Sequence, residues 1–239
     1  MRTRQEIKLI GKEQFKANYW TCVLATLLIG IALGILSSIA YGPQYSEMIN
    51  AATEGREPQI RVTFTANILV IAELLLCGPL TIGLNAFFVR NLMGMRDDLN
   101  VGTPFVEAFK GFGRKLGGFL WMLLFVYLWS LLLVIPGIIK TYSYAMSPYI
   151  LSDCPNVRAT DALKLSKRIM AGHKWELFVF TLSFIGWELL DILTLGLLDV
   201  FFVSPYRNSA MACYYLEVRE TALRNGVITM EQLEGTVPV

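Results

Sequence analysis

The chain alternates long apolar segments with short charged ones, and the segment from Leu116 to Ser152 shows this pattern most strongly. Between Lys115 and Lys140 no charged residue occurs for 24 positions. An α-helix needs ~20 apolar residues to cross ~30 Å of hydrocarbon, so this run is long enough to span a bilayer. Because proline ends or kinks a helix, the Pro136-Gly137 pair predicts a helical hairpin in which the chain turns and returns.

Six apolar segments predict an all-α, polytopic membrane helix bundle with six transmembrane helices arranged as three hairpins. The fourth segment is short and rich in Tyr and Ser, so the flanking charges decide whether it crosses. If it crosses, 17 of the 21 Lys and Arg residues lie on one side, which the positive-inside rule assigns to the cytoplasm together with both termini. If it does not, the basic segment 153–174 lies outside and the rule fails. The predicted spans are 19–41, 64–89, 117–136, 137–152, 175–198 and 200–218.

A basic amphipathic helix is predicted before each hairpin, so that a unit of surface helix, outward span and inward span occurs three times. The first covers residues 3–18 and begins with the capping box of Thr3 and Glu6. The second follows Thr103-Pro104, a favourable pair for a first helical turn. The predicted domains are a cytoplasmic amphipathic helix (1–18), a six-span membrane domain (19–218) and a cytoplasmic tail (219–239). The apolar faces are Phe105, Ala108, Phe109 and Phe112 in the second helix and Ala159, Ala162, Leu163, Ser166 and Met170 in the third.

The basic residues of these helices allow three interpretations. They set the topology, they bind anionic lipid phosphates at ~1 kcal/mol per Lys or Arg, or they dock a cytoplasmic partner. Three amphipathic helices together favour docking at the membrane surface. The residues predicted to contact lipid phosphate are Arg4, Lys8, Lys12, Lys16, Lys110, Arg114, Lys115, Lys164, Lys167 and Arg168.

Five ionisable residues fall within the predicted spans. Each costs ~2.5–3.5 kcal/mol at the centre of a membrane helix unless it is paired, hydrated or neutralised. At ~1.5 Å per residue, two cations and one acid share a layer near the middle of the membrane, with two acids about one turn outward. A structural ion-pair network is the favoured interpretation, and a proton or substrate path is the alternative. The residues are Glu73, Lys140, Glu188, Asp191 and Arg207, and Lys140 or Arg207 is expected to lie between Glu188 and Asp191.

Composition supports the membrane interpretation and limits the chemistry. The 239 residues are 54% hydrophobic and only 17% charged, against ~25% charged in soluble domains, and the mean hydropathy is +0.50. The single histidine, His173, has no partner at metal-binding spacing, and the four cysteines are scattered. No nucleophile, zinc-peptidase or phosphate-loop motif occurs. We therefore expect no cofactor, no metal, no nucleic-acid binding and no enzymatic activity.

The second half of the chain resembles a known family. The runs from Leu128 to Asp153, from Ala162 to Phe178 and from Leu182 to Trp187 are similar to an uncharacterised bacterial membrane-protein family, domain of unknown function 975. The resemblance covers about residues 105–218 and is looser in the N-terminal third. It implies a multi-span protein of bacterial plasma membranes without assigned catalytic residues. A distant similarity to the membrane domain of some glycerophosphodiester phosphodiesterases suggests, by analogy, a lipid-facing or scaffolding role.

Two functions remain open at this stage. The favoured one is a non-enzymatic scaffold or accessory protein of the plasma membrane that engages anionic lipid and a membrane or cytoplasmic partner. The alternative is a small transporter or permeation-related protein that uses the charged residues inside the membrane. A charged cavity open to one face favours transport, whereas a closed, ion-paired core favours the scaffold.

Overall fold

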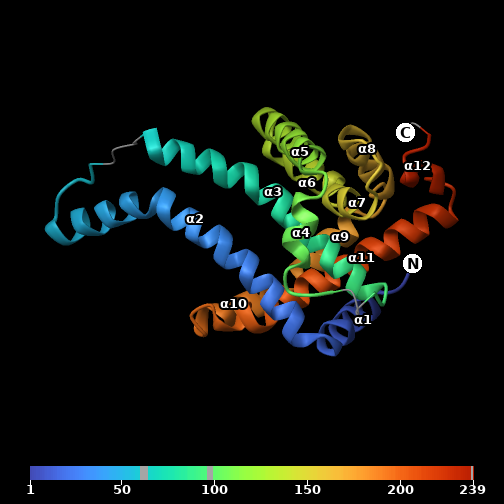
Figure 1. Ribbon diagram of the computed structural model, residues 1–239, viewed down its shortest axis with the longest axis horizontal. Helices are drawn as coiled ribbons and strands as arrows, with labels where there is room; N and C mark the ends of the chain where they lie inside the picture. The colour runs from blue at the N-terminus through green and yellow to red at the C-terminus, as the bar shows by residue number, and fades with distance from the viewer. Residues whose placement is uncertain (60–63, 96–98, 238) are drawn as a thin grey trace.

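The computed structural model describes residues 1–59, 64–95, 99–237 and 239, and within these ranges the chain forms helices and turns without a strand. The prediction of an all-α fold is therefore confirmed. Arg61 and Arg96, which were counted among the loop charges, lie outside the described residues. In chain order (Figure 1) the elements are α1 (Arg4–Ala17), α2 (Tyr19–Glu54), α3 (Phe64–Leu92), α4 (Thr103–Phe109), α5 (Phe112–Leu132), α6 (Val134–Tyr144), α7 (Ser147–Asp153), α8 (Ala159–Ile169), α9 (Lys174–Leu182), α10 (Ile185–Leu193), η1 (Asp199–Val203), α11 (Ser204–Arg224) and α12 (Met230–Glu234).

Helix α1 begins where the sequence predicted. The Thr3 side chain accepts the Glu6 N–H, and the Glu6 carboxylate accepts the Thr3 N–H, so both halves of the capping box are present. The helix packs against α11, and a Cβ at Gly11 would lie only 2.7 Å from the Ala210 Cα. Its inner face is therefore fixed against the protein.

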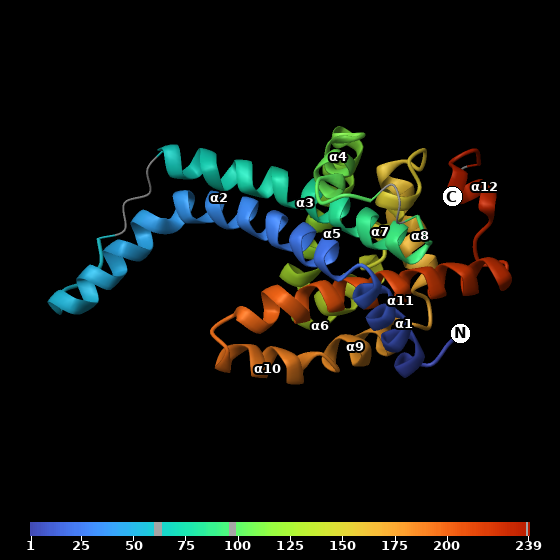
Figure 2. The same ribbon diagram turned by 60° about the horizontal axis from the view of Figure 1, so that its bottom comes forward.

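Helices α2 and α3 form an antiparallel hairpin that extends well beyond the other helices (Figures 1 and 2). In the described part of the chain, two helices are long and apolar enough to cross a membrane, Tyr19–Glu54 and Asn67–Leu92. Large apolar side chains line the outside of the hairpin, including Ile35, Ile39 and Ile71, each more than half exposed. The other four predicted spans do not form single helices of this kind, so the six-span architecture is not confirmed.

The predicted hairpin near Pro136-Gly137 is present, but its break lies three residues earlier. Helix α5 ends at Leu132 and α6 starts at Val134, with Leu133 in extended backbone between them. Pro136 lies in the first turn of α6, where a missing N–H costs nothing. A Cβ at Gly137 would overlap Ser130, so glycine allows the two helices to approach closely.

The fifth and sixth predicted spans are also interrupted. The segment 175–198 is divided into α9 and α10 by a turn at Ser183–Phe184. The connection that follows contains Leu195 and Gly196 at φ 54° and 86°. The last span starts as the short π-helix η1 and continues as α11. Straight helices over 175–198 and 200–218 were therefore wrong in detail.

The second predicted amphipathic face was wrong. Helix α4 ends at Phe109, so Phe112 belongs to α5 and not to the same helix. Phe109 is 57% exposed and stacks on Phe112 at 5.8 Å between ring centroids. Of the predicted face only Ala108 is fully buried, and Glu107 lies beside it on the buried side of α4, where Gly83 of α3 brings the two helices into close contact. Most of the third face was confirmed: α8 buries Ala162, Leu163 and Ser166, and Met170 is buried just after its end, whereas Ala159 is half-buried.

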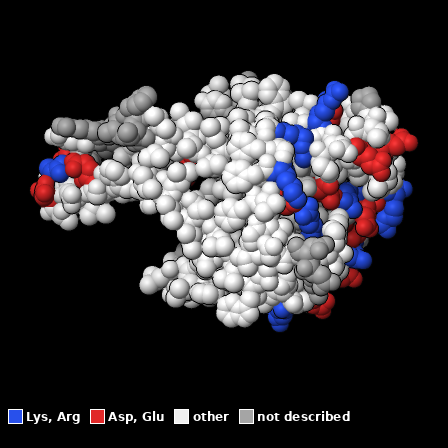
Figure 3. Space-filling model, viewed as in Figure 1, with Lys and Arg blue, Asp and Glu red and all other residues white. Residues whose placement is uncertain are grey.

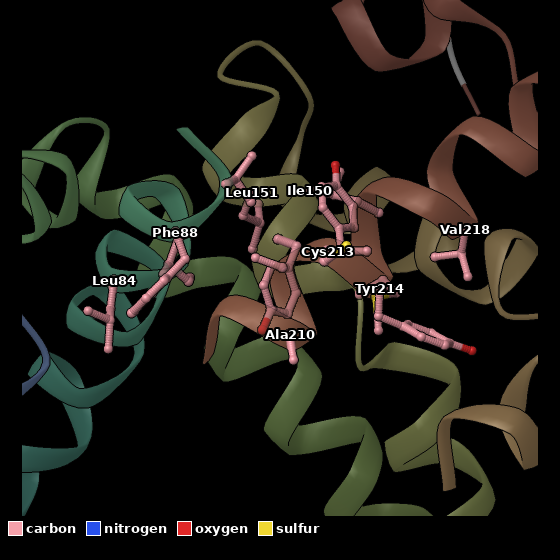
Figure 4. Close-up of a cluster of buried hydrophobic side chains, with 14 of the residues drawn as sticks. Leu84, Phe88, Ile150, Leu151, Ala210, Cys213, Tyr214 and Val218 are labelled. Atoms are coloured by element: carbon pink, nitrogen blue, oxygen red, sulfur yellow. The ribbon is translucent and has the colours of Figure 1, made fainter. Parts of the chain in front are cut away.

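The core lies where α3, α7 and α11 meet. Figure 4 shows apolar side chains from all three helices converging there: Leu84, Phe88, Ile150, Leu151, Ala210, Cys213, Tyr214 and Val218. This core lies at the end of the molecule that carries both termini, away from the tip of the α2–α3 hairpin (Figure 1).

Candidate functional site

Charged residues are unevenly distributed over the surface. Figure 3 shows Lys, Arg, Asp and Glu gathered at the end that carries the termini, with a second small group at the tip of the α2–α3 hairpin. At that tip, Arg56 forms ion pairs with Glu47 and Glu54. The surface between the two groups is almost free of charge on this face. Candidate sites are therefore either the isolated charges of the apolar region or the dense network at the packed end.

The structure joins two of the five charged residues predicted to lie within the spans. Arg207 of α11 donates to Glu188 of α10 at 2.8 Å, and the two side chains are 40% and 50% exposed. This is one of the pairings that the sequence predicted. Asp191, one turn along α10, instead accepts the N–H of Asp199 at 2.7 Å and so holds the turn before η1.

The other two residues lie apart from that pair. The Lys140 ammonium lies 4.4 Å from the centre of the Trp129 ring, a cation–π contact within the α5–α6 hairpin. Glu73 accepts a hydrogen bond from Ser37 across the α2–α3 interface. Its second carboxylate oxygen is buried and has no hydrogen-bond partner among the described residues. The five residues thus occupy separate places and do not form one cluster.

The neighbouring cations Arg114 and Lys115, both predicted to contact lipid, bind the protein's own backbone. Arg114 donates to the carbonyl oxygens of Leu151, Cys154 and Val157 at 2.7–3.0 Å and so closes the C-terminal end of α7. Lys115, 2% exposed, donates to the carbonyl oxygen of Glu107. Their charges position α5 against α4 and α7.

The remaining predicted cations lie closer to the surface. Lys8 lies 4.1 Å from the centre of the Phe184 ring and donates to the Ser183 carbonyl, so α1 holds the turn between α9 and α10. Lys110 and Lys164 form ion pairs with Glu107 and Asp161. The others are exposed or half-exposed: Arg4, Lys12, Lys16, Lys167 and Arg168.

Glu107 is the centre of a charged network that the sequence did not reveal. Its carboxylate, on a residue only 5% exposed, accepts from Lys110 at 2.7 Å and from Arg90 at 3.0 Å. Burial raises the pKa of Glu107, but the hydrogen bond from Lys110 and the charge of Arg90 outweigh it, so the pKa is lowered. Glu107 is therefore ionised and holds two cations in place.

The same network changes the pKa of Lys115. Burial lowers the pKa of the Lys115 ammonium to about 8, and although the Glu107 charge opposes this shift, Arg114, Arg90 and Lys110 add to it. Cations outnumber carboxylates around this site.

A hollow of about 380 Å³ opens beside the network. Four cations and two carboxylates line it, together with Ser152. One of the carboxylates, Asp153, is engaged by Arg219 and by the Tyr215 hydroxyl at 2.9 Å. The charged lining is Arg90, Lys110, Arg114, Lys115, Glu107 and Asp153.

Sequence reasoning missed Glu107, Arg90, Asp153 and Arg219 as members of a site. Asp153 and Arg219 are 66 positions apart, and no local pattern links them. A signal did exist for Glu107, because it lies between Phe105 and Ala108 on a helix that was predicted to be amphipathic. Among the described residues, no group of three or more His, Cys, Asp or Glu side chains is arranged to hold a metal.

Comparison with known proteins identifies one relationship. Residues 117–222 match the model of a family described as a protein of unknown function (DUF975). This confirms the predicted resemblance over α5 to α11 and assigns no chemistry. No curated protein matches the chain. No solved structure matches it either.

Proposed function

We propose that this protein is an integral, six-span protein of the plasma membrane with both termini in the cytoplasm, and that it acts as a non-enzymatic scaffold or accessory protein. The observation that carries the proposal is the almost uncharged surface between two charged ends (Figure 3). Large apolar side chains are exposed there on α2, α3, α5 and α10, and a soluble protein rarely exposes so much contiguous apolar surface. Lipid chains would solvate this apolar surface better than water.

The helix lengths support three hairpins. Helices α2 and α3 are each long and apolar enough to cross a membrane. Helix α5 ends at Leu132, and its uncharged part, residues 116–132, reaches about 25 Å at ~1.5 Å per residue, most of the ~30 Å of hydrocarbon. The chain returns through two short helices, α6 and α7. In the third hairpin both arms are interrupted, one between α9 and α10 and the other between η1 and α11. Broken helices are tolerated in membranes where protein covers the interrupted backbone.

The scaffold role is favoured by how the charges in the apolar region are used. Glu188 is paired with Arg207, Asp191 holds a backbone turn, and Lys140 covers a Trp ring. Each contact has a structural purpose. The exposed cations at the packed end, such as Arg4, Lys16 and Lys167, lie where anionic lipid headgroups or an acidic partner would meet them.

One observation favours the transporter as a second candidate. Glu73 has a buried oxygen without a hydrogen-bond partner in the described part of the chain, and an isolated carboxylate in an apolar hairpin is a common feature of proton paths. Neutralising Glu188 and Glu73 separately (Glu188→Gln, Glu73→Gln) distinguishes the two roles. The scaffold predicts that folded yield falls for Glu188→Gln and that neither change alters proton flux into protein-containing vesicles. Retained yield with lost flux would favour transport.

Membrane insertion itself is tested by extraction. The protein is expected to stay in the membrane pellet in alkaline carbonate and to dissolve only in detergent. Release by carbonate alone would mean that the apolar surface is covered by protein and not by lipid.

A further inference from the structure

The hollow beside Glu107 is lined by more cations than carboxylates. We propose that it binds a phosphate group, carried by an anionic lipid headgroup or free in the cytosol. The proposal deepens the proposed function, on which it rests for placing the hollow at the cytoplasmic surface. The scaffold proposal requires only a charged surface at this end of the molecule, whereas a phosphate site requires these particular residues.

The charges that line the hollow are unequal in number. Arg90, Lys110, Arg114 and Lys115 line the hollow, and Glu107 is the only lining carboxylate that pairs with any of them. Asp153 is occupied by Arg219 from outside the lining, at a second ion pair. Four cations therefore share one carboxylate, and a dianion such as phosphate would offset two of the three remaining positive charges.

The cations are held ready for a ligand. Lys115 and Arg114 are anchored on carbonyl oxygens, so their charges are fixed at the base of the hollow. Arg90 and Lys110 have side chains 37% and 64% exposed. A guanidinium has five N–H donors and an ammonium three, more than the single bond that each gives to Glu107. Donors remain for phosphate oxygens.

The neighbouring surface suits a lipid. A second hollow of about 370 Å³ shares Arg90, Ser152 and Asp153 with the first, and its other lining residues include Ala86, Val89 and Met93. Charged and apolar hollows therefore meet at Arg90, near the predicted end of the span 64–89. A phospholipid likewise has a charged headgroup at one end and apolar chains at the other.

The experiment compares two lysines with similar surroundings. Lys110 pairs with Glu107 at 2.7 Å and Lys164 pairs with Asp161 at 3.0 Å. In each pair the partners are three positions apart in the sequence, and the two lysine side chains are 64% and 57% exposed. Only Lys110 lines the charged hollow. The full-length protein and the variants Lys110→Gln, Lys110→Arg and Lys164→Gln are purified in neutral detergent. Bound phosphatidylglycerol is measured by native mass spectrometry, and inorganic phosphate by calorimetry at constant ionic strength.

We expect Lys110→Gln to weaken at least one probe about fivefold, the loss of ~1 kcal/mol for one cation, with Lys110→Arg and Lys164→Gln close to the original protein. A loss for phosphatidylglycerol alone assigns the site to a lipid headgroup, and a loss for both probes or for phosphate alone assigns it to soluble phosphate. Arg90→Gln, checked for an unchanged melting temperature, provides a second test. Unchanged binding in both hollow variants, or equal losses in Lys110→Gln and Lys164→Gln, would overturn the site. Because detergent micelles have no sidedness, a failed topology experiment would remove the scaffold proposal and leave this result intact.

Discussion

The α2–α3 hairpin and the packed end around α4, α7 and α11 use polar groups in different ways. On the hairpin, Glu73 has one partner and one buried oxygen without any among the described residues. At the packed end, Glu107 holds two cations, and Arg114 donates to three carbonyl oxygens. The packed end therefore satisfies its polar groups through its own contacts, whereas the proposed function places the hairpin in lipid.

The largest effect should come from removing the guanidinium that closes α7. Arg114→Met removes three hydrogen bonds to part-buried carbonyl oxygens, of which only that of Cys154 keeps another donor among the described residues, the Val157 N–H. We expect the free energy of unfolding to fall by about 3 kcal/mol. Arg168→Met, on the exposed face of α8, should change it by less than about 0.5 kcal/mol. Denaturant titration in detergent measures both. Equal small changes would mean that the packed end does not depend on this contact.

Glycine positions provide the next comparison. A Cβ at Gly83 would overlap the Pro104 carbonyl oxygen and Ala108, whereas nothing lies within 4 Å of one at Gly30 on α2. Gly83→Ala should lower the free energy of unfolding by about 2 kcal/mol through overpacking. Gly30→Ala should leave it unchanged or raise it by up to about 1 kcal/mol, because alanine favours a helix. If Gly30→Ala lowers the free energy of unfolding, this face of α2 is covered by another chain.

Lys115 makes the packed end dependent on pH. Its pKa in the folded protein, about 8, lies below the ordinary lysine value of about 10.4. Above about pH 8 the folded form therefore binds fewer protons than the unfolded form, and the free energy of unfolding rises with pH. We expect a gain of about 1 kcal/mol between about pH 7.5 and pH 9 that Lys115→Met abolishes. If the free energy of unfolding of the two proteins changes with pH in the same way, burial does not shift the pKa of Lys115.

The smallest effect concerns the ion pair between α10 and α11. A double-mutant cycle with Glu188→Gln and Arg207→Gln should give a coupling of about 0.6 kcal/mol, as polar contacts between membrane helices do. If the pair faces water, the coupling should fall towards zero in high salt. If it lies in lipid, salt should leave it unchanged.

Local patterns predicted part of this structure well. The capping box at Thr3 and Glu6, the buried face of α8 and a break near Pro136 all depend on residues a few positions apart. The break at Ser183–Phe184 carries no proline or glycine, and the side chain that contacts this turn, Lys8 of α1, lies 175 positions away in the sequence. Long-range contacts of this kind cannot be predicted from the hydropathy pattern of the sequence.

The candidate site shows the same limit. Arg114 and Lys115 look like ordinary loop cations in the sequence, and only the fold shows that both turn inward while Lys110 stays exposed. Arg207 with Glu188 was predictable because both were expensive charges at a similar depth. Glu73 and Lys140 were predicted at depths close to that pair, but they belong to different hairpins and do not reach it.

The most direct test of the account asks which side of the membrane each charged end faces. In a parent without its four cysteines, Lys167→Cys on α8 and Thr53→Cys at the tip of α2 both place an exposed thiol. A maleimide that does not cross membranes is applied to intact cells. The account predicts labelling of Thr53→Cys at once and of Lys167→Cys only after the cells are opened. Labelling of Lys167→Cys in intact cells would contradict it.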